Sequence, residues 1–281
     1  MLGRLCLPPA TAARDPSAWL SMSLTFSSAA APRRAVLSAL LAACMLALAA
    51  PAHAGFARCL SLFPQQHVPQ LPKARAQQTR PLCFDDFAIL YSATSKTPVY
   101  AVERLHRRDL DGARKHKRGR NPFYEEARLP RAERATLDDY RARLPGGERM
   151  DRGHVVPAGD MASAQGFAQS FSLANMVPQV PKANQGPWNR IEQNTRQYVQ
   201  RAQGDVYVFT GPVFGQQPTR LGPGQVWVPE AMFKLVYDIS LNRAWAHWLP
   251  NTEEARVQAP ISHDELTRRL GFDLLRVAPE D

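Results

Sequence analysis

The segment from residue 151 to residue 196 gathers side chains that could together hydrolyse a phosphate ester. That reaction needs a base to take a proton from water, positive charge to offset the charge growing on the phosphate oxygens, and a means of stabilising the leaving oxygen. One histidine, one glutamate, two arginines and two asparagines in this segment cover these tasks: His154, Glu192, Arg152, Arg196, Asn175 and Asn184.

His154 suits the role of base because imidazole titrates near neutral pH and is then largely neutral but still basic. A lone histidine is more often structural, but Arg152 changes this balance. If Met150–His154 is extended, both side chains project from the same face of the strand and place a permanent cation beside a base. The planar guanidinium can pair two anionic oxygens, so the two residues suit a phosphate bound between them.

The stretch Gln185-Gly186-Pro187-Trp188 predicts the entry into a helix that continues through Tyr198, since proline is tolerated in a first helical turn. Asn184 would lie just before that helix. Glu192 and Arg196 would be neighbours one turn apart, so all three could border one cleft. The alternative for Glu192 and Arg196 is a surface salt bridge of small energetic value.

Three stretches together resemble the DNA/RNA non-specific endonuclease family, which carries a ββα-metal active-site motif. They are DRGH at residues 151–154, Asn175 within SLANMVPQ, and NQGPWNRIE from Asn184 to Glu192. Their order and spacing follow the family pattern, and general similarity extends from about Cys59 to the last helix. The resemblance implies hydrolysis of DNA and RNA phosphodiester bonds without preference for sequence or sugar.

The resemblance also implies a role for each principal residue. His154 would be the general base, and Arg152, after Asp151, would bind phosphate. Asn184 would be the one direct protein ligand of a Mg²⁺ ion, with Mn²⁺ as a substitute. Glu192 would hold metal-bound water. A single protein ligand fits magnesium, which dehydrates reluctantly and keeps several waters.

Three further residues follow from the same resemblance. Arg196 would help to stabilise phosphate charge, and Asn175 would support the site by hydrogen bonding. Arg120, in GRNPF, resembles a family arginine near the scissile phosphate, although Arg118 could take that place. The run from residue 106 to residue 120 is the densest basic stretch of the chain. It is either a solvated loop or a loop that contacts phosphates.

The first 54 residues predict a secretory signal peptide. Arg33 and Arg34 precede an apolar run, Ala35–Ala50, which ends in the small-residue cleavage site Ala52-His53-Ala54. Met22 is a possible true start. A membrane anchor and a lipoprotein site at Cys44 are the alternatives. Cleavage predicts a periplasmic or secreted protein of 227 residues with no stable membrane insertion.

The remaining chain carries 31 basic and 24 acidic residues, a formal charge of +7, and should be attracted to polyanions. Only Cys59 and Cys83 follow the cleavage site, and in an exported protein they predict a disulfide. A two-cysteine metal site lacks nearby partners. We therefore expect an extended arm over residues 55–84, tied down by the disulfide, and one endonuclease domain over residues 85–281.

Strands and helices without regular βαβ alternation predict an α+β fold with a mixed, mainly antiparallel sheet and flanking helices. Gly211-Pro212 and Leu241-Asn242-Arg243 should form turns, and Ser262 with Glu265 should cap a helix that stops at Gly271. The expected strands are Phe87–Tyr91, Pro98–Leu105, Asp205–Thr210, Met232–Ile239 and Ala244–Leu249.

The partners expected from this pattern are DNA and RNA substrates, with an inhibitor protein as a further possibility and no assignment of oligomeric state. Two other functions compete with cleavage of nucleic acid. One is an exported protein that binds or takes up nucleic acid without cutting it. The other is a phosphodiesterase acting on small phosphate esters. Intact His154, Asn184 and Glu192 favour an enzyme, and the positive charge favours a polymeric substrate.

Overall fold

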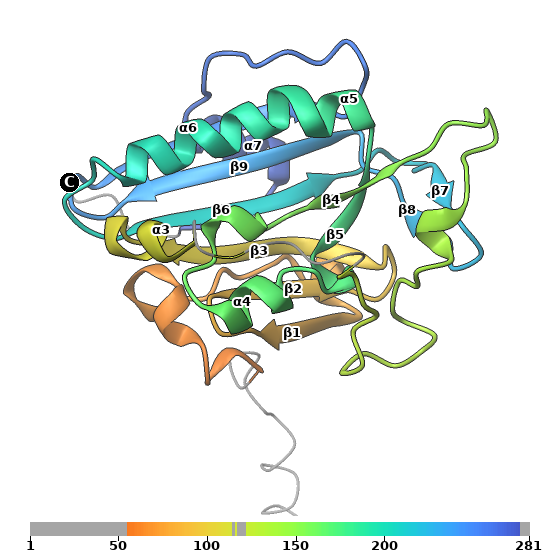
Figure 1. The fold of residues 1–281 in the computed structure, drawn as a ribbon, viewed down its shortest axis with the longest axis horizontal. Helices are drawn as coiled ribbons and strands as arrows, with labels where there is room; N and C mark the ends of the chain where they lie inside the picture. The colour runs from red at the N-terminus through yellow and green to blue at the C-terminus, as the bar shows by residue number, and fades with distance from the viewer. Residues whose placement is uncertain (1–54, 114–115, 117–121, 276–281) are drawn as a thin grey trace, which may run out of the picture. The chain divides into compact units, whose positions relative to one another are not determined.

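The computed structural model describes residues 55–113, residue 116 and residues 122–275. In this part of the chain, six antiparallel strands form one sheet in the order β1-β2-β3-β6-β9-β10 (Figure 1). β2, β3 and β6 are rich in β-branched and aromatic residues, which pack well on a pleated surface. The strands are β1 (Thr79–Cys83), β2 (Phe87–Ser92), β3 (Thr97–Leu105), β6 (Val206–Val213), β9 (Ala231–Asp238) and β10 (Arg243–Pro250). The predicted α+β fold with a mainly antiparallel sheet is confirmed.

Two further antiparallel pairs lie outside this sheet, β4 (Asp151–His154) with β5 (Met176–Gln179), and β7 (Arg220–Leu221) with β8 (Val226–Trp227). The helices are α2 (Lys73–Ala76), α3 (Arg107–Ala113), α4 (Ala164–Gln169), α5 (Pro181–Ala183), α6 (Asn189–Val199) and α7 (His263–Leu270). A π-helical turn, Asn184–Trp188, joins α5 to α6. Short 3₁₀ turns occupy Leu60–Leu62, Pro64–Gln66, Asp139–Arg141, Ala158–Asp160 and Leu173–Asn175.

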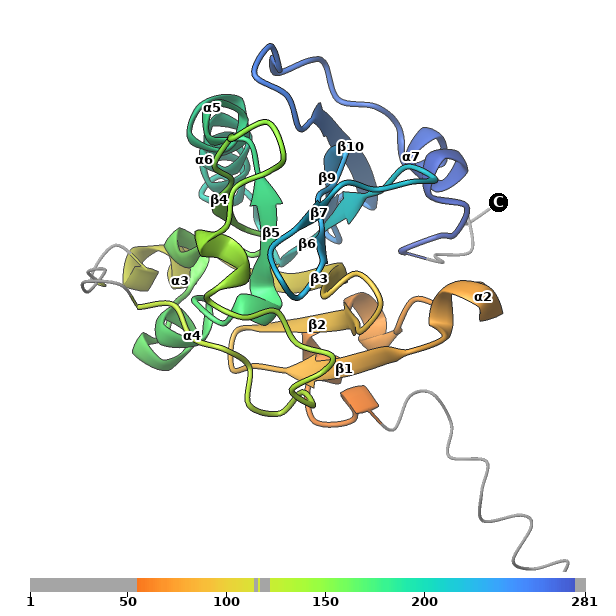
Figure 2. The ribbon, with the colours of Figure 1, turned by 90° about the vertical axis from the view of Figure 1, so that its right-hand side faces the viewer.

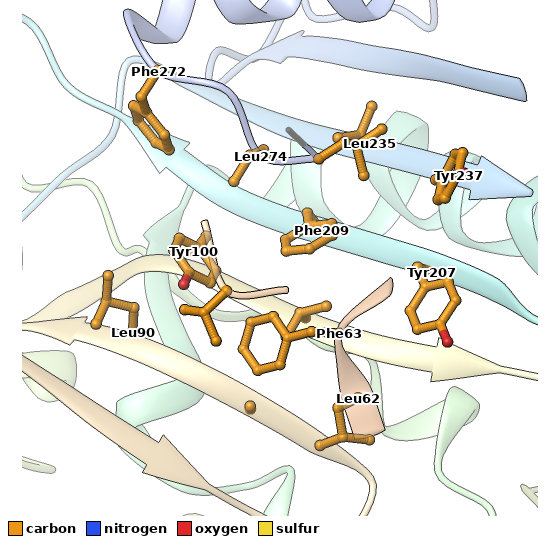
Figure 3. Packing of buried hydrophobic residues seen from close by; sticks show 14 of the residues in the cluster. Leu62, Phe63, Leu90, Tyr100, Tyr207, Phe209, Leu235, Tyr237, Phe272 and Leu274 are labelled. Atoms are coloured by element: carbon orange, nitrogen blue, oxygen red, sulfur yellow. The ribbon is translucent and has the colours of Figure 1, made fainter. Parts of the chain in front are cut away.

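The two faces of the sheet are covered by different parts of the chain. Figure 2 shows α5 and α6 on one side of the sheet and α7 on the other. On the α7 side, Tyr100, Phe209 and Leu235 pack with Phe63 of the arm and Leu274 after α7 (Figure 3). As predicted, Ser262 caps α7 by accepting a hydrogen bond from the Glu265 amide, and Gly271 ends the helix in the left-handed conformation.

The opposite face carries α6 and the β4–β5 hairpin. Trp188 and Ile191 are almost fully buried there and pack in one cluster with Ala101 and Met232 of the sheet. Val199, in the last turn of α6, packs on Val208 and Val236. The prediction that Trp188 and Ile191 lie in the core is confirmed.

The arm is more structured than the sequence predicted. Thr79–Cys83 pairs with β2 and forms the edge of the sheet, so the sheet starts earlier than the predicted hairpin. Phe56 and Phe63 are buried because the arm covers the α7 side of the sheet. The predicted disulfide is confirmed: Cys59 and Cys83 are bonded, with their Cα atoms 5.8 Å apart.

Three local predictions are wrong. Gly211-Pro212 does not form a turn but continues β6, where it pairs with β9. Proline is tolerated there because pairing with β3 has ended at Thr210, so no partner requires its missing N–H. The basic run is not entirely a loop, since Arg107–Ala113 forms α3. The helix predicted to start near Gln185 starts at Pro181 instead, with proline in its first position.

Two predictions fall outside the described residues. One is the signal peptide, residues 1–54. The other is the stretch that contains Arg120 and Arg118, together with Arg114, Lys115 and Lys117. Among the residues that the structure does describe, no helix is both long and apolar enough to cross a membrane.

Candidate active site

β4 presents Arg152 and His154 on one face of a two-stranded hairpin. The Arg152 guanidinium carbon lies 4.1 Å from the centroid of the Phe123 ring, and the His154 ring lies 5.9 Å from the same centroid. His154 also meets Phe171 edge to face at 5.2 Å. Aromatic packing therefore orients both the guanidinium and the imidazole, and the prediction that they share one face of a strand fits this arrangement.

Gly153 between them is required by close packing. A Cβ atom at this position would lie 1.9 Å from the Oε1 of Gln179, a buried residue on β5. The backbones of β4 and β5 pair from Asp151 opposite Gln179 to His154 opposite Met176. Glycine thus allows the strand that carries the base to lie directly against its partner.

Asn175 fastens the chain just after His154. Its Oδ1 accepts a hydrogen bond from the Val156 amide at 3.0 Å, while its Nδ2 donates to the carbonyl oxygens of Val156 and Ser170, each at 2.9 Å. The side chain is fully buried. Three buried backbone groups depend on it, which is the supporting geometry that the sequence predicted for this residue.

Asn184 is placed by an acidic residue of the hairpin. Its Nδ2 donates to Asp151 Oδ2 at 2.9 Å, and Gln185 Nε2 donates to the same oxygen at 2.9 Å. The sequence predicted that Asn184 lies just before the helix. In the structure it is instead the first residue of the π-helical turn. π-helical turns are rare and often occur at functional sites, since they change the direction of side chains within a helix.

Glu192 and Arg196 lie on the face of α6 that turns toward Asp160. Arg196 donates to Asp160 Oδ1 at 2.7 Å, with the Asp160 side chain 2% exposed. Arg196 therefore pairs with Asp160, and not with Glu192 as in the alternative of a surface salt bridge along the helix. Burial raises the pKa of Glu192 to about 7; Lys234 and Arg196 oppose this shift, whereas Asp160 adds to it.

The donor set suits a hard cation held mainly through water. Within the described residues, no group of three or more His, Cys, Asp or Glu side chains could enclose an ion. Asn184 instead offers one amide oxygen, because its Nδ2 is turned to Asp151 and its Oδ1 therefore points away from that carboxylate. A single neutral oxygen donor, with the Asp151 carboxylate beside it, fits Mg²⁺ better than softer metals.

Several residues of this site were missed by sequence reasoning. Asp151 and Asp160 lie within the DRGHVVPAGDM stretch, where residue type alone assigns them no role, and Phe123 lies outside every motif. Lys234 and Glu103 are buried charged residues beneath the site, within strands made mostly of apolar residues. A buried charge inside an apolar strand is the signal that could have found these two.

The antiparallel strands β4 and β5, with His154 on β4, are followed by a helix that carries Glu192 and Arg196, and together they form the ββα arrangement of a nuclease fold. The sequence model of the DNA/RNA non-specific endonuclease family matches residues 70–279. The chain belongs to this family. Its fold resembles that in the crystal structure of the EndoG/EndoGI complex, with a TM-score of 0.60 and 20% identity, covering 79% of this chain and 91% of that one.

Curated relatives match over shorter stretches. The mitochondrial nuclease EXOG of Xenopus laevis is 32% identical over 164 residues, which are 53% of this chain and 42% of that protein. Human mitochondrial endonuclease G is 30% identical over 182 residues, covering 60% of this chain and 56% of that protein. The nuclease of Serratia marcescens is 29% identical over 143 residues, or 47% and 53%. The chain thus spans about half the length of these relatives.

Proposed function

We propose that the chain is an exported endonuclease that hydrolyses phosphodiester bonds of DNA and RNA without sequence preference. The observation that carries this proposal is the bond between Asp151 and Asn184, which fastens the helix to the strand that bears His154. One contact thereby connects the candidate metal ligand with the candidate base. Family membership and the formal charge of +7 after residue 54 support a nucleic-acid substrate.

In the proposed reaction, His154 accepts a proton from the attacking water as that oxygen bonds to phosphorus. The bond between phosphorus and the leaving oxygen breaks, and the leaving oxygen takes up a proton. Packing against Phe171 holds the imidazole in one orientation, so little reorganisation is needed when the proton moves. Arg152, stacked on Phe123, presents a fixed guanidinium plane that can pair phosphate oxygens.

Asn184 would hold a Mg²⁺ ion directly, and Glu192 would hold it through water, with Mn²⁺ as a substitute. When bound, the ion would supply positive charge next to the scissile phosphate. Arg196 adds positive charge near this site, although its ion pair with Asp160 offsets part of it. Arg120 stays a candidate for a further phosphate contact, and it lies outside the described residues.

Export is part of the proposal. The apolar run and small-residue site before Gly55 support a cleaved signal peptide, and the Cys59–Cys83 disulfide suits the oxidising environment of a periplasmic or secreted protein. The proposal includes an inhibitor protein as a partner. The similar structure of EndoG is that of a complex with EndoGI, and its subject is the inhibition of EndoG. N-terminal sequencing of exported protein should find Gly55 first, and a lipidated Cys44 would contradict this.

The function is tested by incubating the exported protein with plasmid DNA, total RNA and bis(p-nitrophenyl) phosphate, each with Mg²⁺ or with a chelator. We expect both polymers to be degraded with Mg²⁺, and chelation to stop this reversibly. The matched variants are His154→Ala, which removes the proposed base, and His67→Ala, which removes an exposed histidine of the arm.

The outcomes separate the candidate functions. Binding of both polymers without cleavage would indicate a nucleic-acid-binding protein. Turnover of the small ester alone would indicate a phosphodiesterase. Full cleavage after exhaustive chelation, or equal loss in the two histidine variants, would contradict the proposed site.

A further inference from the structure

A row of polar residues lies buried beneath α6, behind the proposed active site. Lys234 on β9 is 1% exposed, and the register places it opposite Thr210 of β6 and His247 of β10. Residues directly opposite one another in paired strands share a face of the sheet. Glu103 on β3 lies on the same face, because it is two residues from Ala101, which pairs with Thr210.

Lys234 reaches from the sheet toward the turn that begins α6. Its Nζ donates to Thr210 Oγ1 at 2.8 Å and lies 5.5 Å from the centroid of the Trp188 ring. Trp188 and Glu192 are four residues apart and so share one face of the helical segment. The buried ammonium group therefore lies beneath the part of the helix that carries Glu192.

The charges in this region do not balance without Lys234. Three acidic residues, Glu103, Asp160 and Glu192, interact with the two cations Lys234 and Arg196. Arg196 is already paired with Asp160 at 2.7 Å. Burial raises the pKa of Glu103 well above its ordinary value. Because Arg196 is paired with Asp160, Lys234 is the cation left to face Glu192.

Removing Lys234 would leave Glu192 enclosed without its main opposing charge. Among the influences on the pKa of Glu192, burial is the largest, and Lys234 is the strongest of those that oppose it. An uncompensated carboxylate in a site of low polarity is costly and moves toward water. That movement would take Glu192 away from the position in which it is proposed to hold metal-bound water.

We propose that Lys234 is a positioning residue for Glu192, and that its buried ammonium group holds the Glu192 carboxylate in place at the metal-binding site. This inference rests on the proposed function, since it acts through the role assigned to Glu192. Thr210 would in turn fix the lysine by accepting its hydrogen bond. Neither Lys234 nor Thr210 contacts substrate in this account.

The test is a double-mutant cycle in the full chain with Lys234→Met, Glu192→Gln and both together. Single-turnover cleavage, the Mg²⁺ concentration needed for half-maximal rate, and affinity for DNA are measured for each. We expect Lys234→Met to slow cleavage and to raise the Mg²⁺ requirement, each by roughly 10- to 100-fold. Affinity for DNA should be unchanged. In the Glu192→Gln background, Lys234→Met should add little.

Two variants keep the test decisive if Lys234→Met fails to fold. Thr210→Val removes only the hydroxyl that fixes Nζ, so it should cause a smaller loss of the same kind, again absent in the Glu192→Gln background. Thr97→Val removes a buried hydroxyl of β3 that bonds Ser95 instead of the lysine, and should cleave at nearly the wild-type rate.

The possible failures can be told apart. Two results would overturn the role of Lys234 while leaving the nuclease function intact. One is a full effect of Lys234→Met in the Glu192→Gln background, and the other is an equal loss in Thr97→Val. Full activity of Glu192→Gln would overturn the assignment of Glu192 itself, and the role of Lys234 with it.

Discussion

The Asp151 carboxylate accepts a hydrogen bond from the side-chain amide of Asn184 at 2.9 Å, across 33 residues of sequence. This contact turns the amide nitrogen of Asn184 toward the hairpin and leaves its carbonyl oxygen for a cation. Groups that orient a metal ligand are commonly as important as the ligand, because they select one of its rotamers. In the proposed site, Asp151 would therefore orient the metal ligand Asn184 without being a ligand itself.

Asp151→Ala should make cleavage require more Mg²⁺. Without the carboxylate, Asn184 can rotate, and the Mg²⁺ concentration for half-maximal cleavage should rise roughly 10- to 100-fold. Gln185→Ala is the matched control, because it removes the other donor to the same oxygen and leaves Asn184 bonded. Equal Mg²⁺ requirements in the two variants would argue against an orienting role for Asp151.

Asn175→Ala should destabilise the fold and disturb the base together. The change leaves the Val156 amide and two carbonyl oxygens without their partner, and should lower the free energy of unfolding by about 2–4 kcal/mol. Denaturant unfolding measures this. Asn194→Ala, at an exposed position of α6, should change stability by no more than about 0.5 kcal/mol. Similar values for both variants would contradict the assigned role of Asn175.

The Cys59–Cys83 bond should stabilise the domain mainly by restricting the unfolded chain. Its sequence separation of 24 corresponds to roughly 3 kcal/mol in the chain-entropy account. Reduction should therefore lower Tm, and a Cys59→Ala, Cys83→Ala double variant should show the lower Tm with or without reductant. Two free thiols in the native exported protein, seen by mass spectrometry, would refute the bond.

Glu126 provides a pH dependence of stability. Burial raises the pKa of this carboxyl, but hydrogen bonds and charge from Arg128, with a further bond from Ser172, outweigh it and leave the pKa below its ordinary value of 4.5. A lowered carboxyl pKa contributes stability above the unfolded value, and this contribution is lost as pH falls through the folded value. Wild type should thus lose this contribution below about pH 4.5.

Glu126→Gln tests this dependence because glutamine does not titrate. At pH 7 the variant should be less stable by about 1–2 kcal/mol, a modest value because Arg128 is partly exposed. The difference between the two proteins in the free energy of unfolding, measured with denaturant, should become smaller as pH falls below 4.5. If this difference in unfolding free energy stayed constant or grew in acid, Glu126 would not be held in its ionised form.

The sheet and the principal site segments could be predicted because their signals are local. Short runs of apolar, aromatic and β-branched residues mark β2, β3 and β9, and the order DRGH, Asn184 and Glu192 follows a family pattern. The Cys59–Cys83 bond followed from there being only two cysteines after the predicted cleavage site. These predictions needed no knowledge of which segments meet in space.

The remaining features depend on contacts between distant residues. The partner of Arg196 is Asp160, 36 residues earlier, and helix spacing alone favoured Glu192. The π-helical turn at Asn184 depends on how α5 and α6 pack, not on local propensity. Pro212 predicts a turn when the sequence is taken alone. In the structure it pairs with β9 at a point where β3 pairing has ended, so its missing N–H has no acceptor on β3 to satisfy.

The most direct test of the catalytic assignment is single-turnover cleavage by His154→Ala measured beside its affinity for the same DNA. The variant removes the proposed base but leaves Arg152 and the positive surface in place, so affinity should change little. The cleavage rate should fall by about two to four orders of magnitude. Cleavage at the wild-type rate, with His154→Ala folded and bound to DNA, would contradict the proposal that this histidine takes the proton from water.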